Sequence, residues 1–318
     1  MGIIFQIFPY AVAYTIPLLI TSLGGLFSER SGVVNIGLEG LMVVGSFSSA
    51  LTVFTLQTNY PGMSVFLSIF IGLFVAMISG ILFSLLHAFA CVHLSANQVV
   101  SGVAINMIAT AITVFFARNV TGSGNIHIRS SLSRMNIPLL KSIPILGKLF
   151  FTNTYATTWL VLLLLLGSWF LIYKTPFGLR LRACGENPQA ADAAGINVYL
   201  IRYIGVMFSG AFASLGGAIM LVTFAGEFNG SVAGLGFLAL ASLIFGQWKP
   251  LGILGATLFF GVASTIANIS QVIPVLASIP GILLKIFPYV VTLIALIIFS
   301  KTSQAPKAAG EPFDKSKR

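Results

Sequence analysis

Long apolar runs separated by short polar segments extend along most of this chain. Each run is close to the roughly 20 residues that a helix needs to cross the hydrocarbon core of a bilayer. Backbone groups in lipid must be hydrogen-bonded internally, so we expect these runs to be helices. The pattern predicts an all-α, polytopic transmembrane helical bundle of about 8–10 helices. The expected helices cover residues 7–27, 38–57, 63–90, 98–117, 157–173, 200–223, 233–247, 251–268 and 286–300.

Two of these runs have further features. The first lacks a basic flank and a small-residue cleavage site, so we expect it to remain as a helix rather than to be a signal peptide. The run 233–247 is short and rich in glycine, which favours a broken or re-entrant segment.

Composition supports the membrane class, because 57% of the residues are hydrophobic, only 8% are charged and the mean hydropathy is +1.00. The formal net charge of +10 is explained by lysine and arginine in loops and tails, so we expect a lipid membrane and no nucleic acid as a partner. Cys91 and Cys184 are far apart and predict neither a disulfide framework nor a metal site.

Lysine and arginine in short loops indicate the cytoplasmic side of a membrane protein. Basic residues flank segment 174–197 and fill the tail 301–318, so we place both in the cytoplasm. Counting helices then puts residues 28–32 near the inner face, and the amino terminus and segment 118–156 outside. The basic residues of that outer segment oppose this assignment, although long loops follow the rule less strictly. The chain is thus a transmembrane domain, 1–300, followed by a basic cytoplasmic tail.

Residues 28–40 place Glu29, Arg30 and Glu39 among glycines between two apolar runs. Ionisable groups at such positions are costly unless they are paired or face water, so they indicate a pathway or a switch. Glu29 and Arg30 predict an interfacial charge pair or gate. A short echo, Glu-x-x-Gly, recurs at residues 227–230 and predicts an inverted repeat whose interrupted helices meet near the substrate route. Chance in a glycine-rich chain is the alternative.

Catalytic and nucleotide-binding patterns are weak. His87 and His93 do not have the i, i+4 spacing that places two metal ligands on one helical face, so we expect histidines at helix ends or interfaces. The sequence has no G-x-x-x-x-G-K-[ST] phosphate loop. These patterns argue against an enzyme and against a metal, and any ATP that drives transport would be bound by another chain.

Segment 174–197 links two predicted membrane helices. Asn187 is suited to cap a helix, Pro188 to occupy its first position and Gly195 to end it. The segment therefore predicts a two-turn helix of small residues that can dock into a groove on a partner protein. The alternative is a solvated loop whose charges only set membrane topology.

Several stretches resemble the permease subunits of bacterial ABC importers in the branched-chain amino acid and simple-sugar group, and within it the nucleoside-importing branch. They are TPFGLRLRACGENPQAADAAGIN at 175–197, FSERSGVVNIGLEG at 27–40, ANQVVSG at 96–102 and GFLALA at 236–241. The resemblance covers roughly residues 10–300. It implies a multi-pass protein of the bacterial cell membrane that works with a second permease, two ATPase subunits that use ATP and magnesium, and an extracellular binding lipoprotein. It implies no cofactor in this chain.

The resemblance also makes the short helix a coupling helix that docks on the ATPase. Related importers often carry Glu-Ala-Ala-x-x-x-Gly there, whereas this chain has Asp192-Ala193-Ala194-Gly195, which leaves the docking register open. The candidate coupling residues are Arg180, Arg182, Gly185, Glu186, Asn187, Pro188, Asp192, Ala193 and Gly195.

Candidate substrate contacts are amides and carboxylates that can hydrogen-bond ribose and base edges, with aromatic rings that can stack a base. The alternative for the amides is to join helices across the bundle. These candidates are Asn35, Glu39, Asn97, Gln98, Asn106, Glu227, Phe228 and Asn229, with Phe237 as a further ring.

The outer segment 118–156 carries Arg129 and Arg134, which are candidates to dock an acidic face of the binding lipoprotein. A partly embedded hairpin with membrane-surface charges is the alternative. The sequence leaves other functions open: the same type of permease for simple sugars or branched-chain amino acids, and an ion-coupled secondary transporter.

Overall fold

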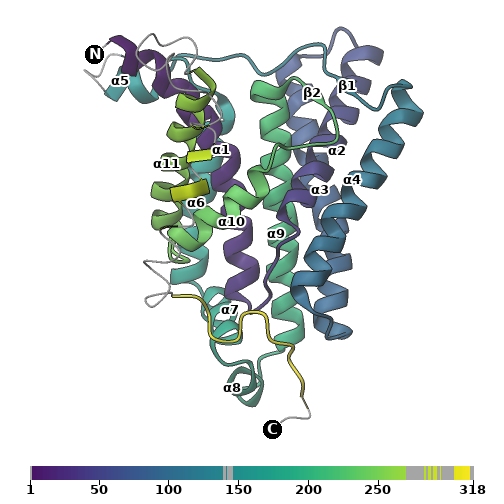
Figure 1. Cartoon of the computed structure of the whole chain (residues 1–318), viewed down its shortest axis with the longest axis vertical. Helices are drawn as coiled ribbons and strands as arrows, with labels where there is room; N and C mark the ends of the chain where they lie inside the picture. Colours follow the sequence, from purple (N-terminus) through teal and green to yellow (C-terminus); the bar gives the residue numbers. More distant parts are fainter. Residues whose placement is uncertain are drawn as a thin grey trace.

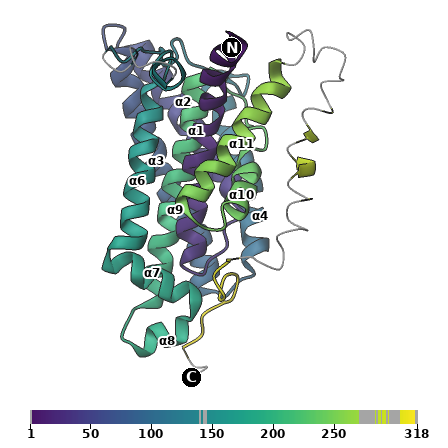
Figure 2. The same cartoon turned by 90° about the vertical axis from the view of Figure 1, so that its left-hand side faces the viewer.

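The structure is a computed structural model that describes residues 2–138, 141, 146–269, 283, 286–287, 289–291, 294 and 304–315. In this part of the chain it is a helical bundle with one pair of very short strands, which confirms the all-α prediction (Figures 1 and 2). The elements are α1 (Gly2–Arg30), α2 (Leu38–Asn59), α3 (Val65–Ala88), η1 (Phe89–His93), α4 (Gln98–Thr121), β1 (Ile126–His127), α5 (Leu146–Phe150), α6 (Ala156–Lys174), α7 (Pro176–Glu186), α8 (Pro188–Ala193), α9 (Val198–Met220), η3 (Leu221–Ala225), β2 (Glu227–Phe228), α10 (Leu235–Phe245) and α11 (Pro250–Ile269).

Seven helices of the described part are long and apolar enough to cross a membrane, and each matches a predicted run. The run predicted at 233–247 is α10, a shorter apolar helix of 11 residues. The run predicted at 286–300 lies mostly outside the described residues. The seven spans are Ile7–Arg30, Leu38–Asn59, Val65–His93, Gln98–Thr121, Ala156–Lys174, Val198–Ala225 and Pro250–Asn268.

Helices α1 and α9 form the centre of the bundle. Their most apolar windows are 89% and 83% buried, whereas the corresponding window of α4 is 22% buried. Figure 1 shows both central helices between α6 and α11 on one side and α3 and α4 on the other. Exposed apolar side chains such as Phe74, Met107 and Leu163 cover the outer helices, as expected for contact with lipid or another membrane subunit.

Glycines let α2 and α9 touch backbone to backbone. A Cβ added to Gly45 would lie 1.9 Å from the carbonyl oxygen of Ser214, and a Cβ added to Gly217 would lie 1.9 Å from that of Met42. Small residues at helix crossings permit this close approach in membrane bundles. The contact fixes the position of α2 against the central helix α9.

Irregular segments interrupt the bundle at 31–37, between α1 and α2, and at 229–234, between β2 and α10. Gly32, Gly230 and Gly234 have positive φ values of 93°, 82° and 78°, which glycine adopts without steric cost. Helix α10 begins in the middle of the bundle rather than at one of its ends (Figure 1). Helices α2 and α10, which follow these two segments, are called the interrupted helices below; an inverted repeat that relates them, and their meeting near a substrate route, remain predictions.

The two ends of the bundle carry different elements. Helices α7 and α8 and residues 304–315 lie at one end, and α5, β1 and β2 lie at the other (Figure 1). Residues 28–32 contact α7, so they lie at one end of the bundle, whereas β1 of segment 118–156 lies at the other. The sequence correctly predicted that these two segments lie at opposite ends. Neither the π-helical turns η1 and η3, which extend α3 and α9, nor the antiparallel pairing of β1 with β2 was predicted.

Candidate coupling and translocation sites

Two short helices make up the predicted coupling segment. Thr175 caps α7 by accepting a hydrogen bond from the Gly178 amide at 3.2 Å, and Asn187 caps α8 by accepting one from the Ala190 amide at 3.0 Å. Pro188 takes the first position of α8, and Gly195 follows its end with φ +81°. The start and stop signals of the second helix are therefore confirmed. Helix α7 was not predicted, although Thr175 and the following proline are its start signal.

Helix α8 has a buried and an exposed side. Pro188 and Ala191 face the bundle, whereas Ala190 and Ala193 are exposed. Asn187 and Gly195, at the two ends of the helix, are also exposed. The exposed side carries small side chains at Ala190 and Ala193, with Gln189 beside them, so a partner surface can approach the backbone closely at the two alanines.

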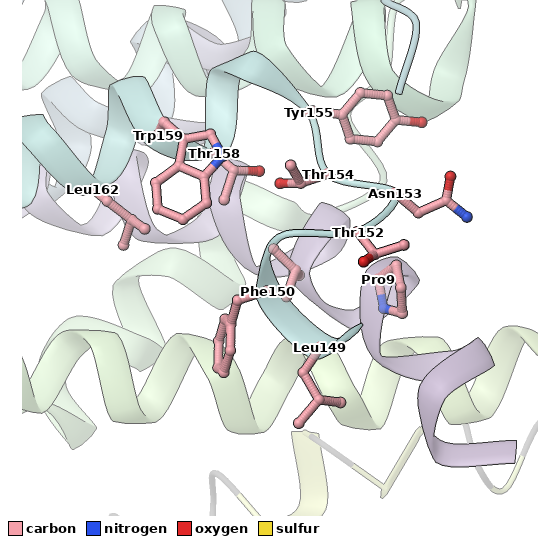
Figure 3. Close-up of a pocket in the computed structure, with 11 residues that line it drawn as sticks. Pro9, Leu149, Phe150, Thr152, Asn153, Thr154, Tyr155, Thr158, Trp159 and Leu162 are labelled. Atoms are coloured by element: carbon pink, nitrogen blue, oxygen red, sulfur yellow. The ribbon is translucent and has the colours of Figure 1, made fainter. Parts of the chain in front are cut away.

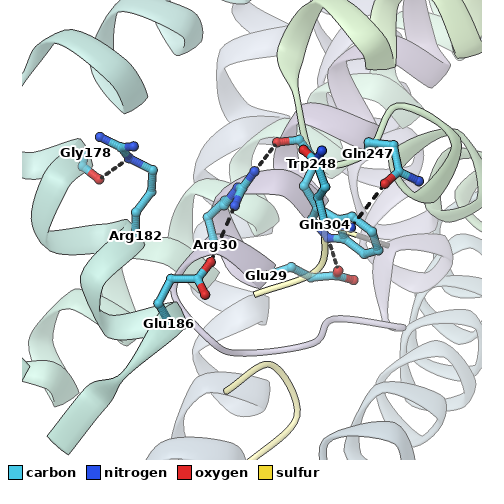
Figure 4. Close-up of polar contacts among 8 residues, drawn as sticks. All are labelled: Glu29, Arg30, Gly178, Arg182, Glu186, Gln247, Trp248 and Gln304. Atoms are coloured by element: carbon cyan, nitrogen blue, oxygen red, sulfur yellow. Dashed lines mark hydrogen bonds and ion pairs between the residues drawn. The ribbon is translucent and has the colours of Figure 1, made fainter. Parts of the chain in front are cut away.

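The end of α7 packs against the end of α1 (Figure 4). Glu186 pairs with Arg30 at 3.9 Å. Gly185 is buried, and a Cβ added there would lie 2.4 Å from the Arg30 carbonyl oxygen. Gly185 is thus a packing residue between two helices and has no free face for a partner.

The remaining charged candidates of this segment have different surroundings. Arg180 is exposed, and Arg182 lies 5.3 Å from the centroid of the Tyr173 ring. Asp192 is mostly covered and pairs with Lys315 of the tail at 3.5 Å. Arg180 is therefore the arginine more accessible to a partner.

Trp248, in the turn between α10 and α11, connects that turn to the end of α1 (Figure 4). Its indole N–H donates to the carboxylate of Glu29, which is 7% exposed. Its carbonyl oxygen accepts from the Arg30 guanidinium at 2.8 Å. Gln247 and Trp248 both have positive φ, an uncommon conformation for residues other than glycine. Glu29 and Arg30 therefore both bind one turn. The ion pair of Arg30 is with Glu186, and a role of the two residues as a gate stays a prediction.

Three of the candidate pathway residues, Glu39, Asn106 and Asn35, lie near the starts of α2 and α10. The Glu39 carboxylate accepts hydrogen bonds from the amides of Gly234 at 2.9 Å and Gly236 at 2.7 Å, so it caps the start of α10. Asn106 of α4 accepts from the Gly40 amide at 2.7 Å. A carboxylate at a helix N-terminus is favourable because it satisfies free N–H groups and the helix dipole.

Asn35 is fully buried beside this meeting point. Its side-chain oxygen accepts from the Gly37 amide at 3.0 Å, and its side-chain nitrogen donates to the Ser209 hydroxyl at 2.9 Å. Asn35 and Asn106 thus join helices, which was the alternative interpretation of the amides. Glu39 is only partly buried.

The other pathway candidates lie elsewhere. Asn97 is exposed and caps α4, while Gln98 is buried and accepts from the Val34 amide at 2.6 Å. The side chain of His87 contacts the Val34 carbonyl oxygen at 3.1 Å, as an interface histidine does. Phe237 is 48% exposed on α10.

The last three pathway candidates lie in or next to β2, at the end of the bundle opposite α7 and α8. They are Glu227, Phe228 and Asn229. Glu227 contacts His127 at 2.9 Å, and Phe228 is 1% exposed with its ring 5.5 Å from that of Phe47. Asn229 is exposed. Phe228 is therefore a core residue in this conformation and does not present its ring for stacking.

The two arginines proposed for docking also differ. Arg129 is exposed. Arg134 donates to the Tyr155 hydroxyl at 3.1 Å and lies 4.2 Å from the centroid of the Tyr10 ring. Arg134 thus holds the outer segment on α1 and α6, whereas Arg129 is available to a partner.

A small cavity lies beside Tyr155, between α1, α5 and α6 (Figure 3). Its volume is about 20 Å³, and it is lined by Thr154 and Trp159, whose polar side-chain atoms have no hydrogen-bond partner among the described residues. A space of this size, with these two polar atoms in a mostly apolar wall, can hold one buried water molecule. It is too small for a transported solute.

A larger cavity of about 270 Å³ adjoins the start of α10. Tyr14, Ser264, Asn268 and Tyr289 give it polar and aromatic walls, and Asn268 donates to the Tyr14 hydroxyl at 3.0 Å. This volume is near the lower end of ligand pockets. Sequence reasoning missed these residues because they sit singly in apolar runs. Among the described residues, no group of three or more His, Cys, Asp or Glu side chains is placed to bind a metal.

Comparison with known proteins decides the family. Residues 7–296 match the model of the permease component of branched-chain amino acid transport systems. The chain belongs to this family. With seven apolar spans in the described part of the chain, this permease is a multi-pass protein of the cell membrane.

Two bacterial relatives align with nearly the whole permease. It is 47% identical to the guanosine ABC transporter permease protein NupQ of Bacillus subtilis, over 98% of this chain and 97% of the relative. It is 44% identical to the nucleoside ABC transporter permease protein NupC of Lactococcus lactis, over 96% and 95%. A second guanosine ABC transporter permease protein of Bacillus subtilis, NupP, is 29% identical over 78% of this chain and 69% of the relative.

Proposed function

We propose that this permease is the transmembrane subunit of an ATP-binding cassette importer that translocates nucleosides. The observation that carries the proposal is the 47% identity, over nearly the full length of both chains, to a permease named for guanosine transport. The relative at 44% identity is named for nucleosides, which supports the same substrate class.

The importer would contain a second, more distant permease. The two Bacillus subtilis relatives support this, because both are named for guanosine transport and differ in their similarity to this chain, 47% against 29%. Two separate ATPase subunits would bind ATP and magnesium, and an extracellular lipoprotein would deliver the substrate. The exposed side of α8, with Ala190 and Ala193, is suited to contact an ATPase, whose closure would move this helix.

Within this permease, the cavity beside α10 is the part best suited to contact a nucleoside. Tyr14 and Tyr289 can pack on a base, and Asn268 and Ser264 can hydrogen-bond its edges or the ribose hydroxyls. Glu39, which caps α10 next to this cavity, would hold the wall in place. Replacing Asn268 by Ala should reduce nucleoside uptake while the protein remains in the membrane.

The deciding experiment is uptake of labelled guanosine and uridine by the native host with and without this gene. Excess nucleosides, ribose and leucine serve as competitors. Loss of uptake on deletion, with competition by nucleosides alone, is expected. Competition by ribose or leucine instead would assign the permease to sugars or amino acids. Uptake that follows an ion gradient and needs no ATPase would contradict the importer itself.

A further inference from the structure

The carboxyl-terminal segment 304–315 is bound to the bundle rather than extended into solvent. In Figure 1 it crosses the end of the bundle near α7 and α8. Its main chain is hydrogen-bonded to two other parts of the chain: the Ala308 amide donates to the Gly185 carbonyl at 2.9 Å, and the Gly310 amide donates to the Gly32 carbonyl at 3.3 Å. These bonds fix the segment to the end of α7 and to the turn after α1.

The same segment contacts α9 and the turn after α10. The Arg202 guanidinium, 1% exposed, donates to the Glu311 carbonyl at 2.9 Å. The Gln304 amide donates to the Gln247 side chain at 3.1 Å (Figure 4). A buried guanidinium that takes a main-chain oxygen of the tail as a partner would lose that partner if the tail left.

A phenylalanine anchors the far end of the segment. Phe313 is 4% exposed, with its ring 5.3 Å from that of Tyr199 in α9. Lys315 then reaches Asp192 of α8 at 3.5 Å. The lysine is 59% exposed, so this ion pair adds little, and burial of the ring is the main attachment.

These contacts connect the end of α7, which leads directly into α8, to the turns of both interrupted helices. Gly32 precedes α2, and Gln247 follows α10, while Asp192 belongs to α8 itself. We propose that residues 304–315 form a positioning strap that transmits movement of α8 to these two turns during transport. The strap rests on the proposed function in one respect, because α8 must be the helix that the ATPase moves.

Attachment of the strap can be tested without any substrate. Trypsin acts on inside-out membrane vesicles, and mass spectrometry follows peptides that begin at Ala308, after the exposed Lys307. In the wild type the scissile bond is protected, because the Ala308 amide is bound to Gly185. Phe313→Ala should speed this cleavage at least tenfold, whereas Phe170→Ala, a surface phenylalanine of α6, should not. Equal cleavage of the wild type and Phe313→Ala would overturn the strap.

Transmission is tested in the complete importer. Phe313→Ala and deletion of residues 304–318 should lower uptake at least fivefold while the ATPase subunits still copurify with the permease. Unchanged uptake in a variant whose strap is shown by trypsin to be released would overturn transmission. If the wild type takes up no nucleoside, the proposed substrate fails, whereas the trypsin result on the strap is unaffected.

Discussion

Glu39 and Gly236 join the two interrupted helices of this permease. The Glu39 carboxylate, in the first turn of α2, accepts a hydrogen bond from the Gly236 amide in the first turn of α10 at 2.7 Å. A Cβ added to Gly236 would lie 2.4 Å from the Cα of Glu39. The two helix starts are therefore in direct contact, and each limits where the other can go.

Glu39→Ala should destabilise the permease, because the amides at the start of α10 lose their acceptor inside the bundle. The expected cost is about 1–3 kcal/mol. Glu39→Gln keeps one acceptor oxygen and should lose less. Thermal unfolding of purified protein, followed by size-exclusion fluorescence, compares the two variants. If both variants unfolded at the wild-type melting temperature, this result would contradict the capping role of Glu39.

Gly217→Ala should lower stability by about 1–3 kcal/mol or more, because its methyl group would meet the Met42 carbonyl of α2. Gly167→Ala is the matched control in α6, where an added Cβ meets nothing within 4 Å. Replacing glycine by alanine at an open helical site is expected to stabilise by about 0.5–1 kcal/mol. Melting temperatures that shift in the same direction would refute the close contact of α2 with α9.

Arg129→Glu should reduce uptake in a salt-dependent manner and leave the melting temperature unchanged, because Arg129 is exposed and available to an acidic partner. Arg134→Glu should instead lower the melting temperature, since Arg134 holds Tyr10 and Tyr155. Uptake at several salt concentrations, together with thermal unfolding, separates the two effects. Wild-type uptake by Arg129→Glu would argue against docking at this arginine.

Ala193→Trp should weaken copurification of the ATPase subunits without loss of the permease from the membrane. The exposed side of α8 has room for the ring only while no partner is docked. Leu179→Trp, at a side chain of α7 that is 63% exposed, controls for added bulk. Gly185→Asp is unsuitable for this purpose because it would collide with α1. Normal ATPase binding by Ala193→Trp would place the docking surface elsewhere.

The Cys184 thiol should react slowly with maleimide in a Cys91→Ser background. Burial raises the pKa of Cys184 from 9.0 to about 11, although the charge of Arg202 opposes the shift. At pH 8 the thiolate is then about 100-fold rarer than in a thiol of ordinary pKa.

The alkylation rate of Cys184 should keep rising from pH 8 to pH 10, and a plateau near pH 9 would exclude the raised pKa. A thiol whose pKa is raised on folding contributes to the stability of the folded state, and this contribution is fully present below pH 9. That contribution is lost as the pH approaches 11.

Sequence alone predicted the features that depend on local rules. Apolar run length located the spans, and Asn187 with Pro188 located the start of α8, because lipid thickness and helix caps act on neighbouring residues. The roles of the amides were harder to predict. Asn35 and Asn106 have the chemistry of a substrate contact, and only the folded chain shows that their hydrogen bonds go to Gly37, Ser209 and Gly40.

Contacts between distant residues could not be predicted from local patterns. Phe313 lies in a polar, basic tail, and nothing near it in the sequence indicates that Tyr199 covers its ring. The cavity of Tyr14 and Asn268 likewise joins residues from opposite ends of the chain.

The backbone contact of α2 with α9 at Gly45 and Gly217 restricts how this permease can change shape. Side chains can change rotamer, but two main chains in contact have no such freedom, and the interior does not deform continuously. The pair must therefore move as one rigid body. We therefore expect any change of shape to come from movement of other elements against this pair.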